Sequence, residues 1–363
     1  MSSTDARGEK NAAAVAVARG EKNAAAVAGG TGVAATAARV SAEESAHFSA
    51  MNPKQVFGEV MGELAERDGG LSVVVSDYGR RLNLDHMRKV LPEGFVQCGI
   101  AEQNQVEVAA ALANEGLTTF APSYATFITG RVYDQIRVNL GMMRSPVALV
   151  GVSAGCESGM LGASHMALED VSLMRGVPNV EVFCPADNAE LASVLRLLAA
   201  APRPAYVRTN MLDGVNLHLD GTTAVAGRAQ RLFLPEGAPR VSLVATGTIC
   251  SRAVEAARLL AADGVSAEVL EMLTVKPLDV AAVDALAAGG RRLVATVEEH
   301  SVVGGLGAAV AERMSVRGGA PALLRLGMPD AYQNADSQAA LLERAGLTAE
   351  GIAARVREHL ALG

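Results

Sequence analysis

The amino-acid sequence predicts an α/β protein with two consecutive parallel-sheet domains. Short β-branched or apolar runs alternate with stretches of helical periodicity, which is the pattern of strands connected by helices. Half of the 363 residues are hydrophobic, but only 3% are aromatic and none is Trp. The core must therefore be aliphatic and rich in alanine, as in proteins whose helices pack on parallel strands. A chain of this length can hold two domains of ordinary size.

The first domain is expected over residues 51–225. Apolar positions between 53 and 66 have helical spacing, and the β-branched run 71–76 has the character of a buried strand. Further strands are predicted at 95–98, 118–122, 147–152 and 180–185, and further helices at 127–142, 165–174 and 188–200.

The second domain is expected over residues 240–363, after a linker at 217–240 that is rich in Gly, Pro and charged residues. The same alternation of short apolar runs and helical patterns continues there. Strands are predicted at 241–246, 267–272, 293–297 and 322–326, and helices at 250–263, 280–288, 305–316 and 348–360.

Residues 1–50 have the character of a low-complexity tail. The segment Ala6–Ala16 recurs without change as Ala18–Ala28, and few large apolar side chains follow it. Such a segment buries too little surface to offset the entropy lost on ordering, so the sequence predicts disorder over 1–50.

Composition excludes several classes of function. A net charge of −7 and a pI near 5.5 argue against a surface for nucleic acid or for anionic membranes. No apolar run approaches the roughly 18 residues that span a bilayer, and the N-terminus lacks the apolar core of a signal peptide. The four cysteines show no CxxC spacing, which argues against disulfides or zinc and indicates the cytoplasm.

A carboxylate stands at the head of an apolar helical pattern in Gly99-Ile100-Ala101-Glu102-Gln103. A glutamate on the first turn of such a helix would be buried, and an unpaired buried charge costs several kcal/mol, so a partner is expected for Glu102. The alternative is a glutamate placed at the helix start by the helix dipole alone.

Several blocks of the chain together resemble the C-terminal half of transketolase, over about 310 residues from Met51 onward. These blocks are Gly99–Gln103, Tyr124–Gln135 (YATFITGRVYDQ), Gly162–Arg175 (GASHMALEDVSLMR), Pro178–Glu190 (PNVEVFCPADNAE), Ala245–Gly247 and Val297–Gly307 (VEEHSVVGGLG). The resemblance implies a pyrimidine-binding domain followed by the transketolase C-terminal domain, and thiamine diphosphate as cofactor. No Gly-Asp-Gly motif occurs in the chain. In this family that motif belongs to a separate domain that binds the diphosphate and Mg²⁺.

The missing motif implies a partner. The chain resembles the C-terminal subunit of a split transketolase, which needs an N-terminal diphosphate-binding subunit to hold most of the cofactor and its Mg²⁺. We expect a heterotetramer of two copies of each chain, because closed two-fold symmetry is common in such assemblies. A sugar or sugar phosphate is the implied substrate.

The resemblance also assigns the cofactor residues. Glu102 would hold N1′ of the aminopyrimidine, and Phe127 would stack on that ring. Tyr124 and Tyr133 would line the same pocket, although ordinary core packing is the alternative for both. Asp77 follows a predicted strand, where α/β sheets place ligand residues; a turn-forming role is its alternative.

Substrate residues follow from the same resemblance. His165 aligns with a histidine that contacts the donor sugar and moves protons, and Arg208 aligns with a phosphate-binding arginine; a structural histidine and a surface ion pair are the alternatives. Two positions depart from the family. Ser153 stands where a histidine is usual, and Leu161 stands where an aspartate binds the donor's C2 hydroxyl. The sequence therefore predicts weak use of common pentose and hexose phosphate donors.

The leading hypothesis is a transketolase-like transferase that moves a two-carbon ketol unit from a ketose to an aldehyde-type acceptor. One alternative is the β subunit of a 2-oxo-acid dehydrogenase E1 component, which shares the two-domain layout. Another is a non-catalytic partner subunit, against which the retained Glu102 and Phe127 argue.

Overall fold

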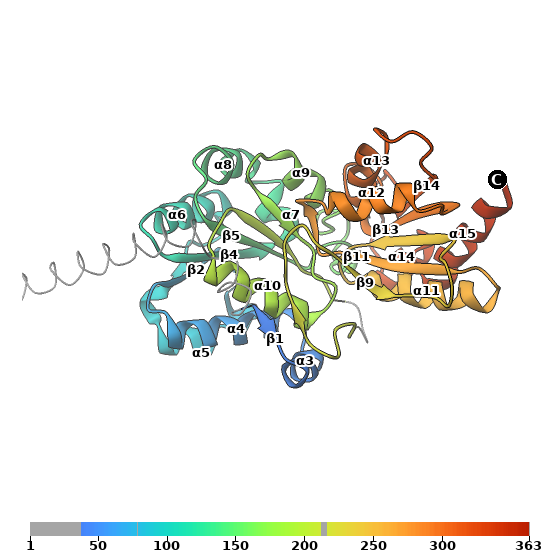
Figure 1. The fold of residues 1–363 in the computed structure, drawn as a ribbon. Helices are drawn as coiled ribbons and strands as arrows, with labels where there is room; N and C mark the ends of the chain where they lie inside the picture. Colours follow the sequence, from blue (N-terminus) through green and yellow to red (C-terminus); the bar gives the residue numbers. More distant parts are fainter. Residues whose placement is uncertain (1–37, 78, 212–215, 363) are drawn as a thin grey trace, which may run out of the picture.

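Two α/β units lie side by side in the computed structural model, which describes residues 38–77, 79–211 and 216–362 (Figure 1). The predicted duplication at 6–28 lies outside these residues. Among the helices of the described segments, none combines the length and the hydropathy that crossing a membrane requires.

The first unit is built on a sheet in the order β12-β6-β7-β5-β4-β2-β3 within the described residues. Every neighbouring pair in it is parallel except β12 with β6. Its strands are β2 (Leu71–Val75), β3 (Phe95–Gln97), β4 (Thr118–Tyr124), β5 (Val147–Val152), β6 (Glu181–Phe183), β7 (Ala205–Arg208) and β12 (Thr274–Lys276). Strands β2 and β5 are buried along their whole length, as expected for apolar runs covered on both faces.

Helices cover both faces of this sheet (Figure 1). The first of them begins at a capping box, in which Ser41 and Glu44 each bind the other's backbone N–H. The helices are α3 (Ala42–Ser49), α4 (Pro53–Arg67), α5 (Asp85–Val90), α6 (Glu102–Asn114), α7 (Ala125–Thr129), α8 (Tyr133–Ile136), α9 (Asp170–Gly176) and α10 (Asn188–Ala200). Short 3₁₀ turns lie at Gly79–Leu82, Pro92–Gly94 and Gly159–Leu161, and a π-helical stretch lies at Arg137–Met142.

The second unit has the sheet order β14-β13-β10-β11-β9 in the described chain, with β9 antiparallel to β11 and the other pairs parallel. The strands are β9 (Ala229–Phe233), β10 (Val241–Ala245), β11 (Ala267–Met272), β13 (Leu293–Ser301) and β14 (Ala322–Met328). The helices are α11 (Cys250–Ala262), α12 (Val280–Ala288), α13 (Leu306–Met314), α14 (Gln338–Arg344) and α15 (Ala349–Leu362). Two parallel-sheet α/β domains are thus confirmed.

Two strand pairings join segments that lie far apart in the sequence. Strand β12 lies after the linker in sequence, yet it is the edge strand of the first sheet, where Thr274 pairs with Phe183. Strand β1 (Arg39–Val40) pairs with β8 (Thr222–Thr223), so the N-terminal segment lies against the linker.

Regular structure is present inside the predicted tail. Disorder was expected up to residue 50, but helix α3 lies within that range, and Phe48 of this helix is 1% exposed. The buried ring of Phe48 and the capping box order this segment, although its low average hydropathy did not predict order. The prediction for residues 38–50 was therefore wrong.

The helix expected over 127–142 is interrupted. Helix α7 ends at Thr129, the backbone leaves helical geometry at Val132, and the rest continues as α8 and the π-helical stretch. Gly130, a poor helix former, stands at the first break. The helix expected over 165–174 begins only at Asp170, so His165 lies in a loop.

Candidate active site

Glu102 opens helix α6 at the carboxyl ends of the first sheet. Gly99, with φ of +76°, makes the turn out of β3. The side-chain amide of Gln105 then donates to the carbonyl oxygens of Val74 at 2.8 Å and Pro122 at 3.0 Å, which fixes α6 to β2 and β4. Glu102 is 4% exposed, so its carboxylate is buried as the sequence predicted.

Arg131 is the partner that the buried carboxylate required. Its Nη1 donates to Oε2 of Glu102 at 2.9 Å, and its guanidinium carbon lies 4.1 Å from the centroid of the Phe127 ring. Sequence reasoning missed this residue. It lies in the break between α7 and α8, so helical spacing from Phe127 gave no signal for it.

Three predicted residues form one aromatic cluster beside this pair. The ring centroids of Tyr124 and Phe127 are 5.8 Å apart, those of Tyr124 and His165 5.6 Å, and those of Phe127 and His165 5.3 Å. All three pairs meet edge to face, a favourable geometry for aromatic rings. The loop that carries His165 thus brings it to the aromatic residues at the end of β4 and in α7.

These residues suit a planar, nitrogen-rich ring. The guanidinium is flat, carries N–H donors, hydrogen-bonds Glu102 and lies over the face of Phe127. An aminopyrimidine offers the same combination of a flat face and ring nitrogens. Glu102 and Phe127 therefore form a pair of contacts that fits the pyrimidine of thiamine diphosphate.

The structure places the two other predicted pocket residues, Tyr133 and Asp77, in different surroundings. Tyr133 packs partly buried among the aliphatic side chains under α6 and α8, and its hydroxyl lies beside Gly176. Within the described residues it makes no ring contact with Tyr124, Phe127 or His165. Asp77 is exposed just after β2.

Ser153 and Leu161 lie in the loop that leads from β5 to His165. Ser153 is buried, with φ of +54°, and its hydroxyl donates to Oε1 of Glu157 at 2.8 Å. The same carboxylate accepts from Lys54 and from the backbone N–H of Met211. Leu161 is 56% exposed on the 3₁₀ turn, so its aliphatic side chain is presented to solvent.

The second unit holds this loop through hydrogen bonds. Glu299 of β13 accepts hydrogen bonds from the backbone N–H of Cys156 at 2.7 Å and from Asn210 at 2.8 Å. A Cβ at Gly155, where φ is +63°, would lie 2.4 Å from the Glu299 carboxylate, so glycine is required there. Burial and the neighbouring Glu299 raise the pKa of Cys156 to about 12, which makes its thiol a poor nucleophile.

Arg208 is buried and paired within this chain. It is 5% exposed, and its Nε donates to Oδ2 of Asp170 at 2.9 Å. Its Nη2 donates to the backbone oxygens of Ala167 and Glu299. Although burial alone would lower it, the charge of Asp170 raises the pKa of Arg208 above its usual value. Within this chain Arg208 therefore acts as a buried anchor between Asp170 and two backbone oxygens, and phosphate binding by it stays a prediction.

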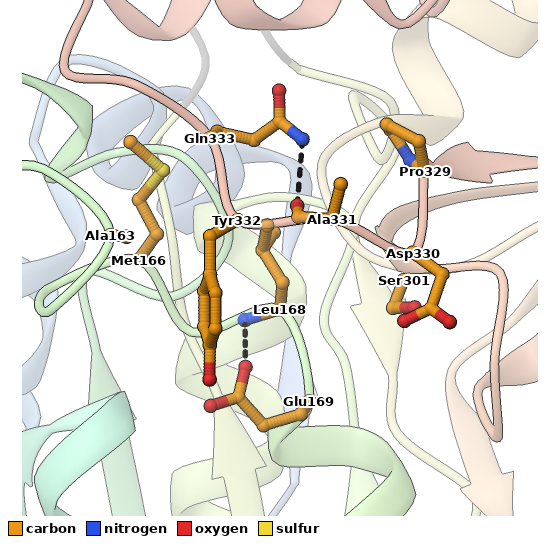
Figure 2. Close-up of a pocket in the computed structure, with 10 residues that line it drawn as sticks. All are labelled: Ala163, Met166, Leu168, Glu169, Ser301, Pro329, Asp330, Ala331, Tyr332 and Gln333. Atoms are coloured by element: carbon orange, nitrogen blue, oxygen red, sulfur yellow. Dashed lines mark hydrogen bonds between the residues drawn. The ribbon is translucent and has the colours of Figure 1, made fainter.

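A cavity of about 370 Å³ lies between the two units, behind the His165 loop. In Figure 2, Ala163 and Met166 stand at one end of it, and Asp330 and Ser301 at the other. None of the ten residues drawn belongs to the aromatic cluster. The contacts proposed for the pyrimidine are therefore not part of the lining of this cavity.

Comparison with known proteins shows the family to which the chain belongs. The transketolase pyrimidine-binding domain matches residues 49–213, and the transketolase C-terminal domain matches residues 231–352. A putative transketolase C-terminal section of Methanocaldococcus jannaschii is 34% identical over 304 residues, which cover 84% of this chain and 95% of the relative. An apulose-4-phosphate transketolase subunit of Phocaeicola vulgatus is 34% identical over 301 residues, which cover 82% of this chain and 94% of the relative.

A solved structure is also similar to the chain in sequence and fold. A split gene transketolase, described as an inactive beta4 tetramer, is 35% identical with a TM-score of 0.76, and the match covers 86% of this chain and 99% of that one. The domains occur in the order that the sequence predicted. The chain belongs to the transketolase family, with a pyrimidine-binding domain followed by the family's C-terminal domain.

Proposed function

We propose that the chain is the C-terminal subunit of a two-component, thiamine-diphosphate-dependent transketolase. The observation that carries the proposal is that the Glu102 carboxylate and the Phe127 ring contact the same planar guanidinium, with His165 against that ring. A carboxylate and an aromatic face in this relation are the contacts an aminopyrimidine needs.

Each residue of the cluster has a distinct task in this proposal. Glu102 accepts a hydrogen bond from the pyrimidine nitrogen and holds the proton there. Phe127 fixes the plane of the ring, and His165 donates to and accepts from substrate oxygens at the open side of the cluster. The cofactor, when bound, supplies the nucleophilic carbon for ketol transfer, while the protein supplies orientation and proton control.

The diphosphate and Mg²⁺ need groups that this chain lacks, because its sequence contains no Gly-Asp-Gly motif. An N-terminal diphosphate-binding subunit would provide them, in a heterotetramer of two copies of each chain. The related split-gene structure, described as an inactive tetramer of one kind of subunit, supports both self-association and the need for a partner. Relatives described as transketolase subunits favour this over the 2-oxo-acid dehydrogenase alternative.

The donor is a ketose or ketose phosphate whose recognition differs from the common pattern. Leu161 presents an exposed aliphatic side chain where the family aspartate binds a hydroxyl, and the Ser153 hydroxyl is engaged by Glu157. One relative acts on apulose 4-phosphate, according to its name, so unusual donors occur among similar subunits.

Reconstitution tests the proposal. The chain is mixed with a candidate N-terminal diphosphate-binding subunit that contains the Gly-Asp-Gly motif, with thiamine diphosphate and with Mg²⁺. Ketol transfer is followed with a panel of ketose donors and aldehyde acceptors. We expect transfer by the mixture, none by either chain alone, and a native mass of two copies of each. Full activity of this chain alone, or release of CO₂ from a 2-oxo acid by the mixture, would contradict the proposal.

A further inference from the structure

A cluster of buried ionisable side chains lies where the two units and their linker meet, away from the aromatic cluster. Asp187 and Glu190 come from the start of α10, His218 from the linker and Glu271 from β11. Glu190 and Glu271 are fully buried, and Asp187 and His218 are 5% and 7% exposed. Three carboxyl groups therefore share one interior site with a single imidazole.

Three of these side chains converge on one point. Nε2 of His218 lies 3.4 Å from Oε2 of Glu271 and 4.0 Å from Oε1 of Glu190. Ligand atoms from all three residues lie within 4.8 Å of one another. In a tetrahedral site with bonds of about 2.0–2.2 Å, ligand atoms lie roughly 3.3–3.6 Å apart, so small side-chain movements would complete the geometry.

Atoms at the centre of the cluster lack hydrogen bonds. Both carboxylate oxygens of Glu271 and Nε2 of His218 are buried and make no hydrogen bond of good geometry among the described residues, although Nε2 and Oε2 of Glu271 lie 3.4 Å apart. Buried polar atoms are nearly always hydrogen-bonded, because an unsatisfied one costs about 1–3 kcal/mol and more when charged. Their common orientation toward one point is what a bound cation would explain.

The remaining contacts hold the imidazole in the orientation that a metal requires. Nδ1 of His218 lies 3.0 Å from Oδ2 of Asp187, which leaves Nε2 directed at Glu271 and Glu190. A carboxylate that accepts the far N–H of a histidine is the usual outer support of a histidine ligand. Glu190 is fixed as well, by the backbone N–H of Ala186 at 2.8 Å and by Gln230 at 3.1 Å.

We propose that Glu190, His218 and Glu271 form a binding site for one divalent transition-metal ion, for which Zn²⁺ is the probe. One imidazole nitrogen and two carboxylates are a common ligand set for such ions. The three ligands come from the first unit, the linker and the second unit. The metal therefore joins these parts and stabilises their arrangement.

A proton is the competing occupant. Burial and the charge of Glu271 raise the pKa of Glu190 well above its usual value. Burial alone would lower the pKa of His218, but its close contacts with Asp187 and Glu271 and the charge of Glu190 raise it to about 12. Protons can thus balance part of the charge when no cation is bound, and the test must separate the two occupants.

The experiment measures metal directly on the full chain, purified without an affinity tag. After removal of metals with a chelator, Zn²⁺ is titrated by calorimetry, bound metal is counted by mass spectrometry, and the melting temperature is recorded with and without Zn²⁺. We expect one ion per chain and a rise of several degrees at saturating Zn²⁺. X-ray absorption should show nitrogen and oxygen ligands and no sulfur.

Matched variants localise the ion. Glu271→Gln keeps the shape of the ligand but removes its charge, and should lose stoichiometric binding and the thermal shift while melting without Zn²⁺ no lower than the wild type. Asp187→Asn should weaken binding by about 10–100-fold as a positioning residue. His86→Gln, which removes an exposed histidine 2.8 Å from Glu66, should change nothing.

Two results would overturn the proposal. One is the absence of stoichiometric Zn²⁺ and of any thermal shift in the wild-type chain, which would assign the cluster to shared protons. The other is equal Zn²⁺ binding by Glu271→Gln, which would place the ion elsewhere. Both readouts are independent of transketolase activity, so their failure leaves the proposed function untouched.

Discussion

Arg131 donates from Nη1 to Oε2 of Glu102 at 2.9 Å, and this contact pairs the buried carboxylate that we propose for the cofactor. The carboxylate is 4% exposed, whereas the arginine side chain is 45% exposed. The pair is therefore neither a surface ion pair worth a few tenths of a kcal/mol nor a fully buried one. It satisfies a buried charge with a side chain that is itself partly exposed to solvent.

Replacing Arg131 with Met should lower the unfolding free energy of the isolated chain by about 1–2 kcal/mol, because Glu102 then stays buried without a partner. Adding Glu102→Gln to that variant should recover part of the loss, since a neutral amide costs less to bury. Denaturant unfolding of the wild type, both single variants and the double variant measures the coupling. Strictly additive effects would show that the ion pair has no energetic role.

Breaking the Arg208–Asp170 pair should act on stability rather than on substrate recognition. Arg208→Met leaves Asp170 buried beside Tyr206, whose hydroxyl donates to the same oxygen at 2.7 Å, and breaking such a pair costs roughly 3–5 kcal/mol. We expect a clear fall in melting temperature. The protein that stays folded should keep its KM for a phosphorylated donor.

A matched control for this variant is Arg203, whose Nε contacts Glu181 at 2.6 Å with both side chains 26% exposed. Arg203→Met should cost less than about 1 kcal/mol, so it measures the loss of one arginine from a partly exposed pair. An unchanged melting temperature for Arg208→Met, combined with a raised KM for phosphorylated donors alone, would support the phosphate-binding role.

Restoring an aspartate at position 161 should broaden donor use. Leu161→Asp returns an acceptor for a donor hydroxyl, and a hydrogen bond to a charged group is worth about 1.5–3 kcal/mol, or roughly 10–100-fold in kcat/KM. Steady-state assays of the reconstituted enzyme with xylulose 5-phosphate and ribose 5-phosphate measure the change. Met160→Asp, at the adjacent and 72% exposed position, should give no comparable gain.

Wild-type kcat/KM of about 10⁴ M⁻¹s⁻¹ or more with these common substrates would contradict the argument about specificity. In that case Leu161 would be a neutral substitution, and the donor hydroxyl would be recognised by other groups of the loop.

Strand and helix periodicity predicted most of the fold because most strands of the two sheets are short buried apolar runs. The prediction did not succeed for contacts that depend on distant partners. Strand β12 has no distinctive pattern, since its three residues become an edge strand only where β6 offers an open edge. Helix α3 is ordered by one ring and one capping box, which an average over composition conceals.

The residues of the candidate site also divide into those that the sequence predicted and those that it did not. Glu102, Phe127, Tyr124 and His165 come together because motif and sheet topology both place them at the carboxyl ends of the strands. Arg131 and the anchoring role of Arg208 depend on side-chain directions set by a broken helix and by a loop. Such directions follow from tertiary packing and have no signature in the spacing of residues.

Substitution of Glu102 in the reconstituted enzyme tests the central claim most directly. Glu102→Gln keeps the size of the side chain but removes the carboxylate, so kcat should fall by about 10²-fold or more while the chain still assembles with its partner. Glu115→Gln, at the exposed C-terminal end of the same helix, should retain wild-type turnover. Near-normal turnover by Glu102→Gln would contradict the assignment of this carboxylate to the cofactor.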